Sequence, residues 1–194
     1  MAATPQQARS PIQDCVHHFR SPGESLYAVA DAARDRELVF AARDEFGLEL
    51  RTLFVGDLAL HLEHVAPHLI AFPPETGFLE RWAEHLGRSA GILLLSAAPA
   101  NEIWTHLRRM FVITDEADQE FSFRYYDPRV LRAYLPTCTA DEAREFFGPI
   151  RRVLVESERP DVMLAFGPDE AGVQMRERSL KTSGPAASTG GAAR

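Results

Sequence analysis

Ser89 lies in a segment whose spacing could expose a nucleophile. The run 87–91, Gly-Arg-Ser-Ala-Gly, matches G-x-S-x-G, which in α/β-hydrolases is a strained turn from a strand into a helix that lifts the serine hydroxyl above the sheet. The flanking residues here predict the reverse order, a helix that ends at Gly87 and a strand that begins at Gly91. The only histidine after Ser89 is His106, and the only acid between them is Glu102. We therefore expect a structural turn at this motif.

Three histidines, His61, His64 and His68, are spaced three and four residues apart, as metal ligands often are. The zinc motif H-E-x-x-H needs both histidines on one unbroken helix and a glutamate as the base. Between His64 and His68 a valine replaces that glutamate, and Pro67 disfavours helical geometry at the residue before it. We expect a loop with histidines and no bound metal.

Other catalytic signatures are missing from the sequence. Neither the dinucleotide motif G-x-G-x-x-G nor the P-loop motif occurs. The only lysine, Lys181, lies near the C-terminus, so a Schiff base in the folded body is excluded. We expect no catalytic residue, no cofactor and no metal, and hence no enzyme. A small hydrolase or metal-dependent enzyme that uses Ser89 or the histidine cluster remains the alternative.

Charge and cysteine content narrow the possible partners and compartment. The 194 residues carry a net charge of −7, and residues 1–175, with 17 basic and 27 acidic side chains, carry −10. Such an acidic body disfavours binding to nucleic acid phosphates or to anionic membranes. No apolar run is long enough to span a bilayer or to act as a signal peptide. With two widely separated cysteines, Cys15 and Cys138, we expect a cytoplasmic protein with reduced thiols and no membrane insertion.

Alternating strand-like and helix-like segments predict the fold class. Strands are expected over 25–33, 50–55, 68–72, 91–96, 150–156 and 162–166, with a β-hairpin formed by 110–114 and 121–126. Helices should follow the N-cap residues Asp35, Thr76, Asp127 and Thr139, the last in a capping box with Glu142. These elements indicate an α/β fold, a single domain in which helices flank a mixed β-sheet.

Composition also suggests where this domain begins and ends. Residues 1–13 are polar and contain prolines, and residues 176–194 are rich in Ser, Thr, Gly and Ala. Such segments bury too little apolar surface to offset the entropy of ordering. We expect a flexible lead over 1–13, a domain over 14–175 and a disordered tail over 176–194.

The run 121–131, Phe-Ser-Phe-Arg-Tyr-Tyr-Asp-Pro-Arg-Val-Leu, resembles the "fRfyDPrvL" signature of the type VI secretion effector-chaperone (adaptor) family. Supporting segments occur in the order found in that family. They are Leu-Tyr-Ala at 26–28, Leu-Phe with Gly at 53–56, Ala-Pro-His-Leu at 66–69, Gly-Ile with Ser at 91–96, His-Leu-Arg at 106–108 and Phe-Phe-Gly-Pro at 146–149. The resemblance extends from about residue 25 to residue 156.

The resemblance implies a protein without catalytic activity. Members of this family hold a toxic effector in the producing cell and help to load it onto a VgrG-type spike protein. The partners implied are therefore a secreted effector and a VgrG-type protein.

Several residues follow as candidates for this role. The signature itself supplies Arg124, Tyr126, Asp127, Pro128 and Arg129, and the candidates for partner binding are Arg108, Tyr126, Arg129, Tyr134, Phe146 and Phe147. Asp127 and Pro128 are explained by helix initiation alone. Arg124 is either an internal brace or a partner contact. Phe146 and Phe147 are adjacent on a short helix, so either one of them remains exposed to a partner or both pack into the core.

Overall fold

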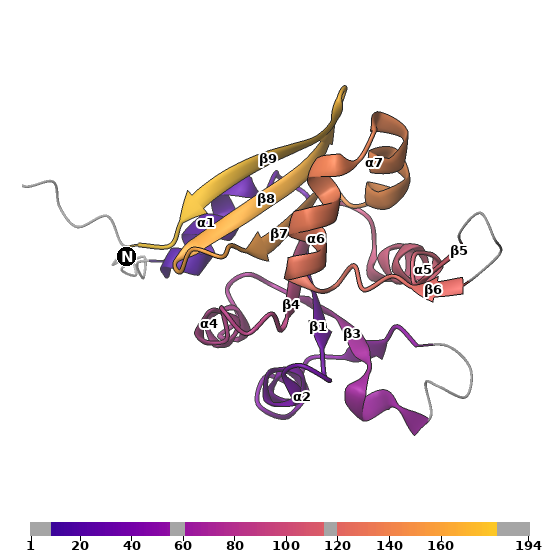
Figure 1. The fold of residues 1–194 in the computed structure, drawn as a ribbon. Helices are drawn as coiled ribbons and strands as arrows, with labels where there is room; N and C mark the ends of the chain where they lie inside the picture. The colour runs from indigo at the N-terminus through magenta and orange to yellow at the C-terminus, as the bar shows by residue number, and fades with distance from the viewer. Residues whose placement is uncertain (1–8, 55–60, 115–119, 182–194) are drawn as a thin grey trace, which may run out of the picture.

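A seven-stranded β-sheet is the centre of the structure. The computed structural model describes residues 9–54, 61–114 and 120–181 (Figure 1). Its strands are β1 (Ser25–Asp31), β2 (Leu50–Thr52), β3 (Pro67–Phe72), β4 (Gly91–Ser96), β5 (Val112–Thr114), β6 (Glu120–Ser122), β7 (Arg152–Glu156), β8 (Val162–Asp169) and β9 (Gly172–Ser179). The order in the sheet is β2-β3-β1-β4-β7-β8-β9, and β5 and β6 form a separate hairpin.

The helices are short and begin mostly where cap residues predict. They are α1 (Pro11–Phe19), α2 (Arg36–Asp44), α4 (Phe78–Glu84), α5 (Ala100–Arg109), α6 (Pro128–Tyr134) and α7 (Ala140–Phe147), with 3-10 turns η1 (Glu63–Val65) and η2 (Leu135–Thr137). The predicted N-caps Asp35, Asp127 and Thr139 are confirmed. Thr76 is not a cap, because its hydroxyl donates to the Pro73 carbonyl and Gly77 takes the N-cap position. No described helix is both long and apolar enough to cross a membrane.

The α/β fold with one helix-flanked sheet is confirmed. The predicted mixture of parallel and antiparallel pairings is not observed, because every pairing among the described strands is antiparallel. The strand-helix-strand units predicted from sequence are present, but a third strand separates the two strands of each unit. β3 lies between β1 and β2, and β1 lies between β3 and β4. Each unit is therefore a split βαβ arrangement, in which the helix connects parallel strands that are not neighbours.

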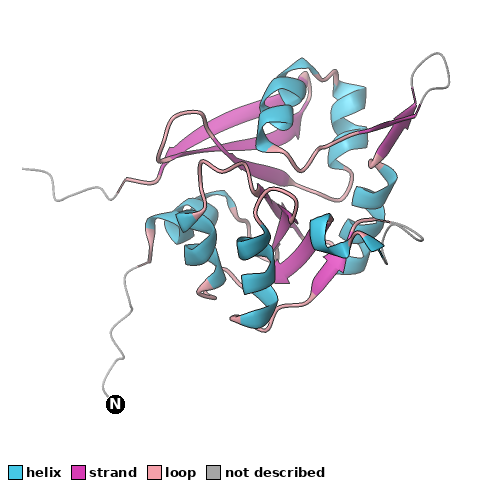
Figure 2. Cartoon of the chain, turned by 60° about the horizontal axis from the view of Figure 1, so that its bottom comes forward, coloured by secondary structure: helices cyan, strands magenta, loops and turns pink. Residues whose placement is uncertain are grey.

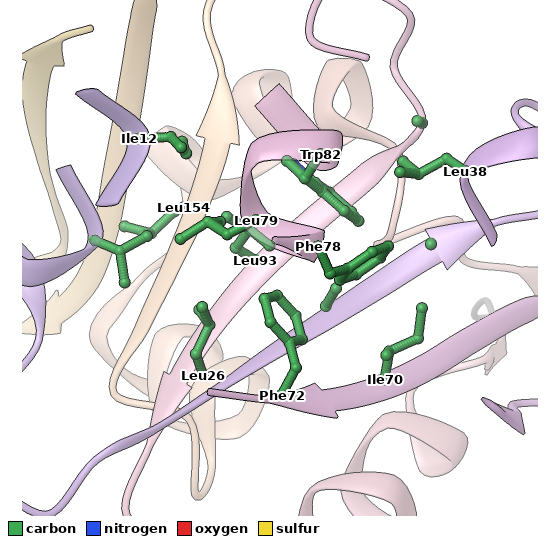
Figure 3. Packing of buried hydrophobic residues seen from close by; sticks show 14 of the residues in the cluster. Ile12, Leu26, Leu38, Ile70, Phe72, Phe78, Leu79, Trp82, Leu93 and Leu154 are labelled. Atoms are coloured by element: carbon green, nitrogen blue, oxygen red, sulfur yellow. The ribbon is translucent and has the colours of Figure 1, made fainter. Parts of the chain in front are cut away.

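Two apolar cores lie on the two faces of the sheet, each covered by helices (Figures 1 and 2). The first core packs α1, α2 and α4 against one face, and its labelled members include Leu26, Phe78 and Leu93 (Figure 3). The second packs α5, α6 and α7 against the other face. Alternate residues of β1 and β4 serve opposite cores, so both strands are buried along nearly their whole length.

Both predicted domain boundaries are wrong. The lead ends before α1, which begins at Pro11 behind the capping residue Ser10 and buries Ile12 within the domain. The domain does not end at Met175, because β9 continues to Ser179 and pairs with β8 along its length. The composition did not indicate β9 because most of its side chains are exposed. An exposed strand has the same kinds of polar residue as a flexible tail. Residues 1–8 and 182–194 lie outside the described residues.

The hairpin is shorter than expected. β5 and β6 pair over three residues each, and the chain leaves the strand after Ser122. The predicted second strand of the hairpin, 121–126, is therefore too long, and Tyr125 and Tyr126 are both buried in the second core. The side chain of Phe121 lies outside the described residues. This irregular segment carries the signature into α6.

Candidate functional site

Helix α6 begins at the Asp-Pro pair of the signature. Asp127 adopts an extended backbone, and its Oδ1 accepts a hydrogen bond from the Arg129 amide at 3.0 Å. Pro128 occupies the first turn, where its fixed φ suits the helix and its missing N–H leaves no donor unpaired. The sequence interpretation of both residues as helix-start chemistry is confirmed.

Asp127 also fixes the side chain of Arg129. The guanidinium makes two hydrogen bonds to the carboxylate, Nε to Oδ1 at 3.0 Å and Nη2 to Oδ2 at 2.6 Å. Burial raises the pKa of Asp127, but the hydrogen bonds from Arg129 outweigh it and hold the pKa below its usual value. Arg129 is half-exposed, so a fixed cation faces solvent at the start of α6.

Arg124 braces the signature to the first strand of the sheet. Its Nη2 lies 3.1 Å from Oδ2 of Asp31, which is buried at the end of β1 and also accepts the Ala33 amide. The guanidinium lies 5.8 Å from the centre of the Tyr126 ring. Of the two alternatives for Arg124, the internal brace is the one observed, although about half of its side chain, 47%, remains exposed.

An open hollow, called here the signature hollow, lies beside these ion pairs. It is lined by Phe123, Arg124, Asp127, Arg129, Val130, Ala133 and Tyr134. Its apolar floor includes the edge-to-face pair of Phe123 and Tyr134, whose ring centres are 5.0 Å apart. Burial raises the pKa of Tyr134 to about 12, so its hydroxyl keeps its proton at neutral pH. The hollow thus combines apolar surface with two arginines at its rim.

Only some of the predicted partner-binding residues reach this hollow. Arg129 and Tyr134 line it, whereas Arg108 lies on α5 with its guanidinium carbon 4.1 Å from the centre of the Trp104 ring. Tyr126, Phe146 and Phe147 are buried in the second core, and for the two phenylalanines core packing is the alternative observed. Helix α7 packs against β8 and β9, and the rings of Phe123 and Tyr134 cover the part of Phe146 that the sheet leaves open.

The G-x-S-x-G motif forms the predicted turn from a helix into a strand. It connects α4 to β4, and Ser89 has a left-handed backbone with a φ of 55°. Its hydroxyl donates to Oε1 of Glu156 at 3.2 Å, and the Ser89 and Gly87 amides donate to the same carboxylate at 2.9 and 2.6 Å. The motif therefore binds a buried glutamate of β7, an arrangement unlike a nucleophile elbow.

We expect Glu156→Ala to lower the free energy of unfolding by about 3 kcal/mol, because two amides and a hydroxyl would lose their buried acceptor. Urea unfolding followed by circular dichroism measures this change. Glu156→Gln, which keeps one acceptor oxygen, should fall between alanine and wild type. Equal stability of all three proteins would show that the carboxylate does not hold the turn.

The three histidines are not assembled into a metal site. His61 and His64 are exposed, whereas His68 is buried in β3 with its Nδ1 2.9 Å from the Ala66 carbonyl oxygen. Burial lowers the pKa of His68. Within the ranges that the structure describes, no three His, Cys, Asp or Glu side chains are close enough to hold a metal ion.

Sequence reasoning missed a buried pair between α2 and α4. His85 Nδ1 lies 2.6 Å from Oδ2 of Asp35, whose Oδ1 accepts the Leu38 amide at 3.1 Å. Burial raises the pKa of Asp35, but the hydrogen bonds from His85 and Leu38 outweigh it and leave the pKa below its usual value. The cap at Asp35 was readable from sequence, but its partner is 50 residues away and no local pattern indicates it.

This pair predicts a pH-dependent contribution to stability. Since the pKa of Asp35 is lower in the folded chain, its carboxylate stabilises the fold above the ordinary value of about 3.9, and the contribution is lost as pH falls through the folded pKa. Asp35→Asn should therefore cost about 1–2 kcal/mol at pH 7 and less at pH 3. Thermal unfolding at both pH values tests this. An equal cost at both would contradict the stabilising role of the ionised Asp35 carboxylate.

Comparison with known proteins gives one match. A family model described as "Domain of unknown function (DUF4123)" matches residues 26–145, which include the whole signature hollow. No curated protein and no solved structure matches the chain.

Proposed function

The chain belongs to the family described as "Domain of unknown function (DUF4123)", and from this membership we propose that it is a non-catalytic cytoplasmic adaptor of a type VI secretion system. In this role it binds a secreted effector protein and promotes its loading onto a VgrG-type spike protein. It acts through protein contacts and needs no cofactor.

The observation that carries the proposal is the form of the signature hollow. The residues that resemble the effector-chaperone signature form an open surface with an apolar floor and a rim of arginines. Apolar surface rimmed by polar groups suits the binding of a protein segment, and tyrosine and arginine are the residue types that often dominate such interfaces. The main alternative, hydrolysis at Ser89, has less support because the serine hydroxyl is bound to Glu156.

The first test is co-purification with a candidate effector of the producing cell, such as one encoded beside this gene. The full chain should form a stable complex with that effector, and deletion of the chain should reduce effector abundance in the producing cell. Absence of a complex together with unchanged effector abundance would refute the proposal.

Changes in the hollow should then weaken the complex without unfolding the adaptor. Ala133 is exposed and lines the hollow, so Ala133→Glu adds a charge to the apolar floor with little effect on the core. We expect this variant and Tyr134→Ala to weaken effector binding by about 2 kcal/mol or more, roughly thirtyfold. Isothermal titration calorimetry measures the loss. Ala97→Glu, at an exposed alanine outside the hollow, is the matched control and should bind like wild type.

A further inference from the structure

Strand β9 forms one edge of the large sheet and is long for an edge strand. It pairs with β8 in continuous register from Gly172 to Ser179, with no proline and no bulge. No other described strand pairs with it, and it is the outermost strand on its side of the sheet (Figure 1). Edge strands in natural proteins are commonly shortened, bulged, interrupted by proline or lined with charged side chains, since a regular edge can accept a further strand. Of these devices β9 has only the charged side chains.

The register shows which backbone groups of β9 are free to bond outward. The Leu180 amide donates to the Asp161 carbonyl at 2.7 Å, a ladder bond that continues the pairing with β8. In an antiparallel pair, hydrogen-bonded and non-hydrogen-bonded residues alternate. The residues whose N–H and C=O face away from β8 are therefore Val173, Met175, Glu177 and Ser179.

The side chains along this edge carry a defined charge pattern. Arg176 and Arg178 are two residues apart, so both point to the same face of the sheet, and both are exposed. Neither forms an ion pair with another described residue, whereas Glu177 on the opposite face pairs with Arg159. Positive charge continues inward on the same face, where burial and the charges of Arg151 and Arg176 lower the pKa of Arg152.

This pattern favours a foreign strand over a second copy of the chain. A symmetric pairing centred on Arg176 would oppose this arginine to itself, and one centred on Glu177 would oppose Glu177 to itself and Arg176 to Arg178. A pairing centred on Met175 would oppose Arg176 to Gln174 and Arg178 to Gly172, so it avoids like charges but gives neither arginine an acidic partner. Like charges directly opposite each other destabilise a strand pair, and opposite charges stabilise it. Acidic side chains on every second residue of a partner strand would face both arginines.

We propose that the outer edge of β9 accepts an extended segment of a partner protein as an added strand, and that this segment carries acidic side chains at alternating positions that face Arg176 and Arg178. Backbone hydrogen bonds to Met175 and Glu177 supply the pairing, and the arginines select the sequence. The inference rests on the proposed function only for the identity of the partner, the effector.

The first experiment uses the full chain and its effector. Hydrogen exchange at the amides of Met175 and Glu177 should slow about tenfold or more in the complex, since these amides face away from β8 in the free protein. Met175→Pro removes an outward N–H but no ladder bond to β8, so it should weaken binding at least tenfold. Met175→Ala, which keeps the N–H, is the matched control and should bind like wild type. The double variant Arg176→Glu, Arg178→Glu should also bind at least tenfold more weakly.

A synthetic strand tests the edge without the effector. The probe is the acetylated and amidated peptide Thr-Glu-Val-Glu-Val-Glu-Thr, compared with the same peptide carrying Gln for each Glu. The acidic peptide should slow exchange at both amides and bind about fivefold more tightly than the Gln peptide, as expected for two opposite-charge pairs across strands.

The outcomes separate this inference from the proposed function. If the effector binds wild type and Met175→Pro equally, with no protection of the two amides, the inference is refuted and the adaptor proposal stands. If the effector does not bind but the acidic peptide protects the amides, the adaptor proposal fails and the inference stands. A failure of the acidic peptide to protect them, or protection that follows dimerisation of the chain, would also refute the inference.

Discussion

Replacing Phe147 with alanine is expected to lower the free energy of unfolding by about 3–5 kcal/mol, because a buried phenylalanine leaves a large cavity when it is truncated. The side chain is 1% exposed and belongs to the core between the sheet and α5, α6 and α7. Chemical unfolding by urea measures the loss. Since small domains are stable by only about 5–15 kcal/mol, much of the protein could unfold at physiological temperature.

Phe147→Leu is the control, because it keeps most of the volume and should cost no more than about 1.5 kcal/mol. The comparison also separates the two roles considered for this residue. A partner contact at Phe147 would give an alanine variant that unfolds like wild type and loses only effector binding. That result would contradict the buried position of Phe147 and would show that its side chain contacts the effector.

Gly91→Ala should cost on the order of 4 kcal/mol, the second largest effect we expect. A Cβ at this position would lie 2.1 Å from the Val29 carbonyl oxygen and 2.9 Å from the Ala30 Cα. These are backbone atoms of the paired strand β1, so a side-chain movement cannot relieve the contact. Thermal unfolding and the yield of folded protein are the measurements.

Gly87→Ala is the matched control, at the other end of the same motif. Gly87 has a left-handed backbone with a φ of 88°, but a Cβ there would meet nothing within 4 Å. Its substitution should therefore cost only the backbone strain, about 1–2 kcal/mol. If Gly91→Ala is no less stable than Gly87→Ala, close packing of β4 against β1 is not the reason for this glycine.

The two glycines also explain why this sequence matches a catalytic motif. Gly87 permits the turn after α4, and Gly91 permits the close approach of β1 and β4. The Ser89 amide and hydroxyl bind Glu156. Each conspicuous residue of the motif therefore has a structural role in the connection between α4 and β4.

Helix starts were predictable from the sequence because their chemistry is local. Asp35, Asp127 and Thr139 each bind a backbone amide two or three residues further along, so residue type and spacing were sufficient. The buried strands β1 and β4 were predictable for a similar reason, since continuous apolar runs are typical of strands covered on both faces. The signature of the family is likewise contiguous, and its resemblance could be recognised without a structure.

The tertiary structure alone decided which of these residues meet. Arg124 binds Asp31 across 93 residues, His85 binds Asp35 across 50, and Glu156 binds Ser89 across 67. The order of the strands, with β3 between β1 and β2 and β1 between β3 and β4, could not be predicted from the sequence either. Nothing in a local pattern specifies such pairings, because they depend on how distant segments pack.

The same reason accounts for the open alternatives at Phe146 and Phe147 and for the error at β9. The periodicity of one short helix left open whether one of the two phenylalanines faces a partner, whereas neighbouring elements cover both. The polar composition of β9 suggested a tail, whereas its backbone pairs with β8. Most of the local elements, most of their caps and the family were readable from the residues alone. Burial and pairing were decided by the tertiary structure, because they depend on surfaces that other parts of the chain supply.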